Sequence, residues 1–249
     1  MFRVVIPARY ASTRLPGKPL ALLGGLPLVL HVHRLALRSG AAEVVIATDD
    51  DRIRAAGLAQ GADVEMTGTG HASGTDRIAE VVARRGWAPD AIVVNVQGDE
   101  PLLPHALISQ AARLLADDPK AAIATLATPI SPPEEFCNVN IVKVVTDAHA
   151  HALYFSRAPI PWLSDGATPA SVGARRHLGI YAYRVEALQQ LAAMPPSALE
   201  QAERLEQLRA LQAGLVIAVA DAIEPPGPGI DTPEDLLRAE AALRRDTAS

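Results

Sequence analysis

Short runs of β-branched and apolar residues alternate with stretches of helical periodicity through the first half of the chain. Apolar positions at helical spacing predict helices from Leu28 to a stop signal at Gly40, over 51–60 and over 75–85. The runs between them predict buried strands at 4–6, 43–48, 63–66 and 91–96. This order predicts an α/β fold in which a mostly parallel sheet carries helices on both faces.

The second half of the chain is less regular. We expect a helix over 197–213, ended by Gly214, and another from Pro233, capped by Thr232. Strands are expected at 121–128, 141–146, 152–156, 177–183 and 215–219. The stretch 163–175 is rich in Gly, Ser, Ala and Pro and predicts a mobile loop. We therefore expect one domain over 1–249, with a small antiparallel subregion inserted at roughly 130–183 that could serve in dimerisation.

Composition narrows the possible partners. The chain has 249 residues, 4% of them aromatic, and a formal net charge of −5, which argues against nucleic-acid binding. Its longest apolar run, 19–30, is too short to span a bilayer, so we expect no membrane insertion. Cys137 is the single cysteine, which excludes an internal disulfide, and no signal-peptide pattern opens the sequence. These features predict a cytoplasmic protein.

Three cations follow the first predicted strand. Arg9, Arg14 and Lys18 lie in a polar loop that also contains Gly17. Guanidinium groups match phosphate geometry, lysine supplies a point charge, and glycine lets a backbone approach closely. The loop fits a phosphate-binding cradle, and by itself it fits a solvated basic surface loop equally well.

Two carboxylates at other strand ends could complete such a site. Asp99 comes soon after the predicted strand 91–96, and Asp231 precedes the capped helix at Pro233. Mg²⁺ is commonly held by one or two carboxylates, with substrate phosphates completing its shell. Each aspartate alone also fits an ordinary turn residue. Together with the basic loop, they favour a site for a nucleoside triphosphate and a metal.

Other chemical motifs are absent or ambiguous. The sequence has no Walker motif, and the glycines of 68–74 do not fit a dinucleotide fingerprint, which speaks against a P-loop kinase and a Rossmann dehydrogenase. No His/Cys spacing suits zinc. A purely structural role also fits three other residues: a charge at a strand end for Arg157, a buried histidine for His177, and a solvated helix face for Glu206.

Several motifs, in order along nearly the whole chain from Val4 to about Leu237, carry a family resemblance. They are IPARYASTRLPGKPL, ATDD, SGTDRIAEV, VVNVQGDEP, VKVV, ALYFSRAPIPW, RHLGIYAYR, LEQLRAL and GIDTPEDL. Each is weak alone, but together they are specific. The chain resembles the 3-deoxy-manno-octulosonate cytidylyltransferases (CMP-Kdo synthetases). The resemblance implies a Rossmann-like, nucleotidyltransferase-type sheet and a homodimer. It also implies a Mg²⁺-dependent enzyme that couples CTP to the anomeric hydroxyl of Kdo, releasing pyrophosphate, for lipopolysaccharide biosynthesis.

The resemblance also implies roles for individual residues. Asp99 and Asp231 would hold Mg²⁺ and, with Lys18, would form the catalytic set. The residues implied to bind the nucleotide are Arg9, Arg14, Lys18, Ser73 and Arg77. Those implied to line the sugar pocket are Gln97, Arg157, His177, Tyr181 and Glu206, with Arg157 facing the sugar carboxylate. One Mg²⁺ would neutralise the triphosphate, and a second could lower the pKa of the attacking hydroxyl.

The sequence leaves alternatives open. Residues 136–140 read Phe-Cys-Asn-Val-Asn where the family often has Asn-Pro-Asn, which puts the conformation of that loop in doubt. Another acidic sugar could replace Kdo, the chain could bind nucleotide without turnover, and a dehydrogenase is a third, disfavoured interpretation. We also expect the basic loop to close on CTP and to be poorly ordered without it.

Overall fold

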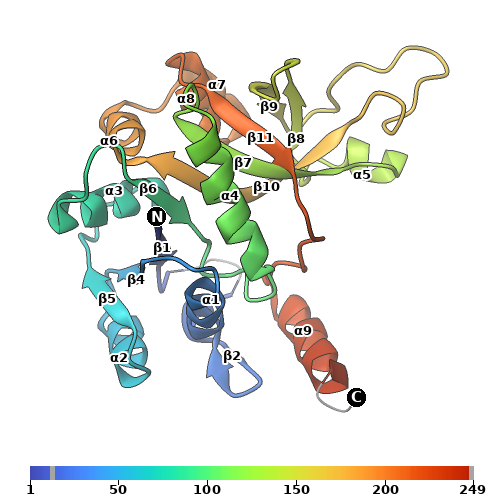
Figure 1. The fold of residues 1–249 in the computed structure, drawn as a ribbon. Coiled ribbons are helices and arrows are strands. Elements are labelled where there is room, and N and C mark those ends of the chain that lie inside the picture. The colour runs from blue at the N-terminus through green and yellow to red at the C-terminus, as the bar shows by residue number, and fades with distance from the viewer. Residues whose placement is uncertain (12–14, 247–249) are drawn as a thin grey trace.

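The computed structural model describes residues 1–11 and 15–246 of the chain, with side chains up to residue 241. A central sheet has the strand order β11-β7-β10-β6-β1-β4-β5, with β8 and β9 attached beside β10 (Figure 1). Its strands are β1 (Phe2–Ala8), β4 (Glu43–Thr48), β5 (Asp63–Met66), β6 (Ile92–Asn95), β7 (Ile123–Pro129), β8 (Lys143–Thr146), β9 (Ala152–Ser156), β10 (Arg175–Arg184) and β11 (Ile217–Asp221). A separate two-stranded hairpin is formed by β2 (Leu22–Leu23) and β3 (Leu26–Pro27).

Helices connect and cover these strands. They are the 3-10 helix η1 (Lys18–Leu20), α1 (Leu28–Leu37), α2 (Asp51–Ala59), α3 (Gly74–Arg85), α4 (His105–Asp117), α5 (Pro133–Cys137), α6 (Val185–Ala193), α7 (Ala198–Glu203), α8 (Gln207–Gln212) and α9 (Pro233–Asp246). Asp50 caps α2 by accepting from the backbone N–H groups of Arg52 and Ile53. Ser73 and Asp76 form a capping box at the start of α3.

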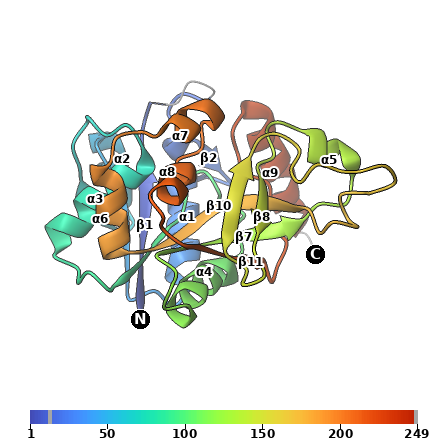
Figure 2. The same cartoon turned by 90° about the horizontal axis from the view of Figure 1, so that it is seen from above.

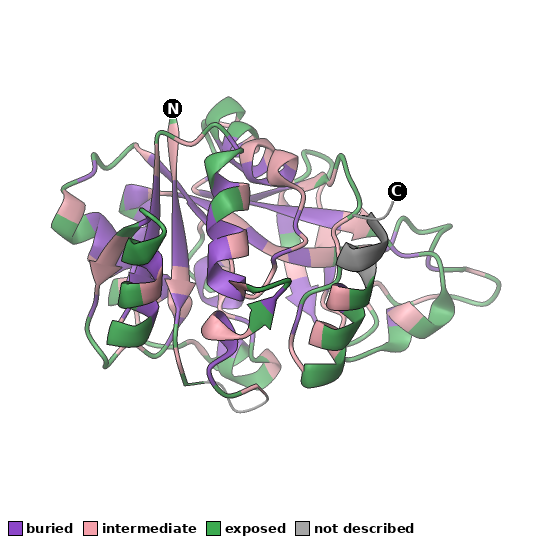
Figure 3. Cartoon of the chain, turned by 90° about the horizontal axis from the view of Figure 1, so that it is seen from below, coloured by how far each residue is buried: buried purple, intermediate pink, exposed green. Residues whose placement is uncertain are grey.

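Alternate residues of β1 enter two different cores. Val4 and Ile6 pack with α1, α2 and α4 on one face of the sheet. Val5 packs with α3, α6 and α8 on the other, where α3 and α6 lie side by side (Figure 2). The strands are therefore buried on both faces, while the helices keep an exposed outer side (Figure 3). A strand buried on both faces has a continuous apolar sequence, which is why these strands were predictable.

The expectation of a mostly parallel sheet is confirmed. The pairs β1–β4, β1–β6, β4–β5 and β7–β11 are parallel. The strand β10 runs antiparallel between β6 and β7, inside the main sheet. The expected subregion at roughly 130–183 therefore contributes a central strand, and only β8 and β9 lie off the main path. The division of the chain into one domain with an insertion stays a prediction.

The single helix predicted over 197–213 is wrong. The chain forms α7 and α8 instead, and Arg204 between them adopts the left-handed conformation with φ of 55°. Helical propensity is favourable throughout this stretch, so periodicity alone could not show the break. The break turns Leu205 into the core and starts α8 at a new angle.

The structure also resolves the loop that departs from the family pattern. After α5, the side chain of Asn138 accepts from the backbone N–H of Asn140, and the N–H of Ile141 donates to the Asn138 carbonyl. The buried ammonium of Lys143 donates to the carbonyls of Asn138 and Ile141. The loop predicted over 163–175 is confirmed for 163–174, which contain neither helix nor strand, whereas Arg175 already begins β10. Its mobility stays a prediction. No helix in the described ranges combines the length and apolar character that crossing a membrane requires.

Candidate active site

Parallel strands β1 and β6 bring the basic loop beside Asp99. The two strands are neighbours in register, so the segments after their carboxyl ends meet at one edge of the sheet. A Cβ on Gly98 would lie 3.2 Å from the carbonyl oxygen of Pro7, so glycine permits this close approach. Gly17 takes a left-handed φ of 69° and turns the chain into η1, which carries Lys18.

Asp231 reaches the same point from the far end of the chain. The backbone N–H of Ile230 donates to the carbonyl of Asp99 over 3.1 Å. The carboxylate of Asp235 then accepts from the N–H groups of Asp231 and Thr232, which fixes the start of α9. Hydrogen bonds to Asp235, first among them that of Arg238, hold the pKa of its carboxyl well below the usual range.

Lys18 lies between the two aspartates. Its Nζ is 2.5 Å from Asp99 Oδ2 and 2.7 Å from Asp231 Oδ1. The lysine is only 7% exposed, whereas both carboxylates open toward solvent. Three residues predicted from distant motifs thus meet at one point.

The two carboxylates fit Mg²⁺ by their chemistry. They direct hard oxygen atoms at a single point, where the Lys18 ammonium now provides the positive charge. The described residues contain no group of three or more His, Cys, Asp or Glu side chains able to hold a metal. A pair of carboxylates still suits Mg²⁺, because phosphate oxygens commonly supply the remaining ligands.

A cavity of about 390 Å³ surrounds this point. Its lining includes Arg9, Lys18, Gln97, Asp99 and Asp231. Arg14 lies outside the described residues, as does the centre of the loop expected to close on CTP. Glu100, the next residue after Asp99, is half-buried and lies outside the lining of this cavity; burial raises its pKa to about 7, helped by the adjacent charge of Asp99. The cavity therefore combines cations with acidic oxygens, as a metal–triphosphate complex requires.

Two residues implied to contact the nucleotide have structural partners here. Ser73 caps α3 and lies outside the lining of this cavity. Arg77 is fully buried, and its guanidinium pairs with Asp49 Oδ2 at 2.8 Å and donates to the hydroxyl of Thr67. This pairing ties α3 to the end of β4, and Arg77 lies outside the lining of the Lys18 cavity. The roles of Ser73 and Arg77 toward the nucleotide stay predictions.

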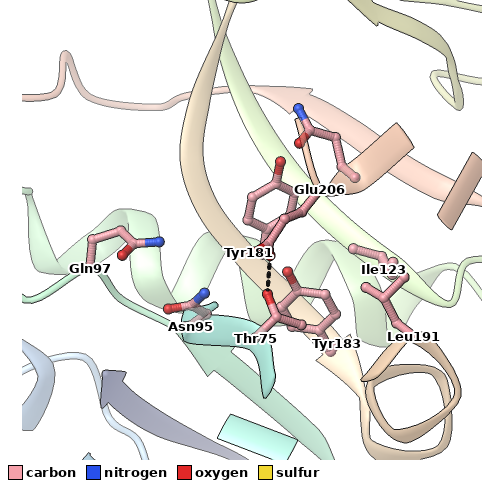
Figure 4. A pocket seen from close by; sticks show the side chains of 10 residues that line it. Thr75, Asn95, Gln97, Ile123, Tyr181, Tyr183, Leu191 and Glu206 are labelled. Carbon is pink, nitrogen blue, oxygen red and sulfur yellow. Dashed lines mark hydrogen bonds between the residues drawn. The ribbon is translucent and has the colours of Figure 1, made fainter. Parts of the chain in front are cut away.

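A second cavity, of about 140 Å³, adjoins the first. Gln97 lines both cavities, and Tyr181 and Glu206 join it in the second, so three of the residues implied for the sugar pocket come together (Figure 4). Glu206 Oε2 accepts from the hydroxyl of Thr75 over 2.6 Å. Burial raises the pKa of the Tyr181 phenol far above its ordinary value, so it stays a neutral hydrogen-bonding group.

Sequence reasoning missed other residues of the second cavity, among them Thr75, Asn95, Tyr183 and Gln207. Asn95 is a polar residue at the end of the otherwise apolar strand β6, whereas Gln207 opens α8, which mixes polar and apolar residues. A buried polar residue in an apolar strand is a signal that could have identified Asn95.

His177 and Arg157 lie outside the lining of the second cavity. The centroid of the His177 ring lies 5.0 Å from that of Phe155, in an edge-to-face contact, and 5.2 Å from that of Tyr181, whose ring is tilted against it. Its Nε2 lies 3.0 Å from Thr125 Oγ1, whose proton is directed to the carbonyls of Leu178 and Ile180. His177 must therefore donate to Thr125, and burial lowers its pKa to about 3.

Arg157 is held by main-chain acceptors and by Glu203. The Arg157 Nε donates to the carbonyl of Glu203, and its Nη1 to that of Val139. The Glu203 carboxylate accepts from the Arg157 N–H and from the Ser156 hydroxyl. The Arg157 guanidinium thus connects the end of β9 to α7 and to the 138–141 loop. The role of Arg157 toward a sugar carboxylate stays a prediction.

Comparisons with known proteins match nearly the whole chain. A family model described as cytidylyltransferase matches residues 3–218. The 3-deoxy-manno-octulosonate cytidylyltransferase of Thioalkalivibrio sulfidiphilus is 55% identical over 98% of this chain and 99% of its own. The enzyme of the same name from Halorhodospira halophila is 54% identical over 98% of this chain and 96% of its own. The one from Stenotrophomonas maltophilia is 55% identical over 98% of this chain and 97% of its own. The solved structure of CMP:2-keto-3-deoxy-manno-octonic acid synthetase complexed with CTP superposes with a TM-score of 0.90, at 42% identity over 99% and 100% of the two chains.

Proposed function

Because the chain belongs to the 3-deoxy-manno-octulosonate cytidylyltransferase family, we propose that it couples CTP to the anomeric hydroxyl of Kdo, giving CMP-Kdo and pyrophosphate for lipopolysaccharide biosynthesis. The family resemblance predicted from the sequence motifs is thereby confirmed. The observation that carries the proposal is the pair of adjoining cavities that share Gln97. One, the charged cavity, holds cations and aspartates; the other, the neutral cavity, is lined by uncharged side chains apart from the single carboxylate of Glu206. Two adjoining cavities can hold a nucleotide and a sugar acid with their reacting groups close together, which lowers the entropic cost of the reaction.

The charged cavity is the proposed CTP site. Lys18 and Arg9 provide cations for the triphosphate, and Gly98 allows the segments that follow β1 and β6 to lie close together beside them. A relative of the same fold binds CTP, which supports this assignment. Transfer breaks the bond between the α-phosphorus and the leaving pyrophosphate, so positive charge beside the β- and γ-phosphates favours the departure of that group.

We propose Mg²⁺ as the cofactor, with Asp99 and Asp231 as its protein ligands. When bound, Mg²⁺ neutralises triphosphate charge and lowers the pKa of the attacking hydroxyl. The chain's own contribution is to hold the two carboxylates on one point, through the Ile230–Asp99 backbone hydrogen bond and the Asp235 cap. Lys18, which contacts both carboxylates, orients them and carries charge for the phosphates.

The neutral cavity is the proposed sugar site. Amide, phenol and hydroxyl groups line it, together with the single carboxylate of Glu206. Such groups donate and accept hydrogen bonds to sugar hydroxyls without needing a charged partner. Because Gln97 lies between the cavities, it is placed to contact the reacting end of the sugar.

We further propose a cytoplasmic homodimer. Several large apolar side chains lie exposed on and near the β8–β9 hairpin, among them Leu153, Val139 and Trp162. Exposed apolar surface of this kind suits contact with a second copy of the chain. Light scattering of the purified protein tests this proposal, with a mass near twice 26.2 kDa expected and a mass near 26.2 kDa contradicting it.

Pyrophosphate release from CTP, assayed with a panel of acidic sugars and Mg²⁺, tests the function. We expect release with Kdo and little with sialic-type or eight-carbon amino sugars. Release with another acidic sugar but not with Kdo would overturn the specificity. Nucleotide binding without release on any sugar would instead indicate a sensor without turnover.

A further inference from the structure

Asn95 carries a polar atom that the fold does not satisfy. The residue ends β6, is 3% exposed, and lines the neutral cavity. Among the described residues, its Oδ1 has no hydrogen-bond partner. Buried polar side chains are nearly always hydrogen-bonded, so an unpaired Oδ1 on a residue that lines a cavity indicates a group held ready for a ligand.

The neighbours of Asn95 are already engaged with each other. Thr75 donates its hydroxyl proton to Glu206 Oε2, and the Tyr181 and Tyr183 rings stack on each other at 5.7 Å. Figure 4 shows Asn95 and Gln97 projecting toward the space between them and the Thr75–Tyr181 side of the cavity. Asn95 therefore lines the cavity with a carboxamide whose Oδ1 is paired with no described protein group.

The charge of the two cavities indicates how a sugar acid would lie. None of the described residues that line the neutral cavity is a cation, and Glu206 adds negative charge there. A sugar carboxylate would be repelled from Glu206 and attracted to the cations of the other cavity. The hydroxylated part of the sugar, which is uncharged, fits the neutral cavity.

We propose that Asn95 is a specificity-determining residue whose carboxamide hydrogen-bonds a sugar hydroxyl remote from the carboxylate, while the carboxylate stays on the Gln97 side, toward the cations. The inference rests on the proposed function, because it takes the neutral cavity to be the sugar site. A carboxamide suits this task, since turning it by 180° exchanges donor and acceptor without a change of shape.

The strand position explains why the contact would be selective. The Cα of Asn95 pairs with that of Tyr181 on β10 and with that of Val5 on β1, at the centre of the sheet. A side chain fixed by two neighbouring strands cannot follow a displaced hydroxyl, so a sugar that lacks this group leaves the amide unpaired.

The test substitutes Asn95→Leu, which keeps the side-chain volume and removes hydrogen bonding. We expect the KM for Kdo to rise about tenfold, the KM for CTP to stay within about twofold, and the melting temperature to hold or rise. The matched control is Val81→Ala, which removes volume from the same core without lining the cavity. It should lower the melting temperature and leave the KM for Kdo unchanged.

A purely structural Asn95 would give the opposite result, a lower melting temperature with an unchanged KM for Kdo, and that outcome would overturn the proposal.

A second measurement uses Kdo analogues that each lack one hydroxyl. One analogue should lose about tenfold in kcat/KM with the unsubstituted enzyme and almost nothing with Asn95→Leu. Equal losses in both proteins would contradict the proposal, and Asn95→Ser replaces Asn95→Leu in this comparison if the leucine variant does not fold.

The proposed function can fail separately. If the unsubstituted enzyme releases no pyrophosphate with Kdo, the function is wrong whatever Asn95 does. If it does release pyrophosphate and both Asn95 measurements show no selective loss, only the present inference is wrong.

Discussion

Lys18 is the residue on which the charged cavity depends. Its ammonium balances two carboxylates that would otherwise repel each other, although both are open enough for water to screen part of that repulsion. The same ammonium also competes with any divalent cation for the two oxygen atoms.

Replacing Lys18 by Met should therefore lower the melting temperature without metal and enlarge the stabilisation by Mg²⁺. The reason is that Mg²⁺ meets no competing charge in the variant and relieves more repulsion. Thermal unfolding with and without Mg²⁺ measures both effects. Lys120→Met, at an exposed lysine away from the cavity, is the control and should behave like the unsubstituted protein. An equal Mg²⁺ shift in all three proteins would refute the competition.

His177 gives the protein a predictable sensitivity to acid. Burial lowers its pKa to about 3, below the ordinary value of 6.5. Between these values the unfolded chain binds a proton that the folded chain does not, so the free energy of unfolding falls as the pH falls. One proton makes a slope of about 1.4 kcal/mol per pH unit.

His177→Gln should flatten the decline of the free energy of unfolding between about pH 6 and pH 4, as measured by urea denaturation. Glutamine keeps a donor for Thr125 but does not titrate. Phe155→Leu, which disturbs the packing on the same ring, should lower stability by a similar amount at every pH. If His177→Gln keeps the full acid slope, the burial argument for His177 fails.

Single residues of the site were predictable only where their type is unusual for their place. Asp99, Asp231 and Lys18 stand at strand or helix ends, where charge is conspicuous. The partners of Arg77 depend on side-chain direction, which a sequence does not give, so its burial against Asp49 could not be foreseen. The orphaned Oδ1 of Asn95 likewise appears only in three dimensions.

Among secondary-structure elements, the break between α7 and α8 has the clearest energetic consequence. Arg204 holds a left-handed conformation that costs a non-glycine residue about 1–2 kcal/mol. Glycine removes that cost but loses more conformational entropy on folding, about 0.5–1 kcal/mol.

Arg204→Gly should therefore raise the free energy of unfolding by about 0.5–1 kcal/mol, as measured by urea denaturation. Arg204→Ala, which keeps the backbone strain, should give no gain. A gain of the same size for alanine would show that the arginine side chain, and not its backbone, is the source of the strain.

The strands were more predictable than the helices. Runs such as 43–48 are β-branched and buried on both faces, so their sequence is distinctive. The structure adds the helices α4, α5 and α6 and the 3-10 helix η1 to those predicted, and it splits the helix predicted over 197–213. Helix ends depend on caps and tertiary packing, which periodicity does not report.

For the molecule as a whole, the fold joins segments that are far apart in the sequence. The charged cavity takes residues from the segments that follow β1 and β6 and from the start of α9, and the neutral cavity takes residues from β6, β10 and the α7–α8 break. The rule that ligands lie beyond the carboxyl ends of parallel strands foresaw the first cavity. It could not foresee the second, because that cavity depends on the antiparallel strand β10 inside the sheet.

In the proposed function, Asp99 and Asp231, held together beside Lys18, make the charged cavity the place where CTP reacts. The most direct test is the rate of pyrophosphate release by Asp99→Asn at saturating CTP, Kdo and Mg²⁺. Asp50→Asn is the matched control, because Asp50 also follows a parallel strand but caps α2, and asparagine caps equally well. We predict that Asp99→Asn is slower by about 100-fold or more while Asp50→Asn is unchanged. Near-normal turnover by Asp99→Asn would contradict the claim.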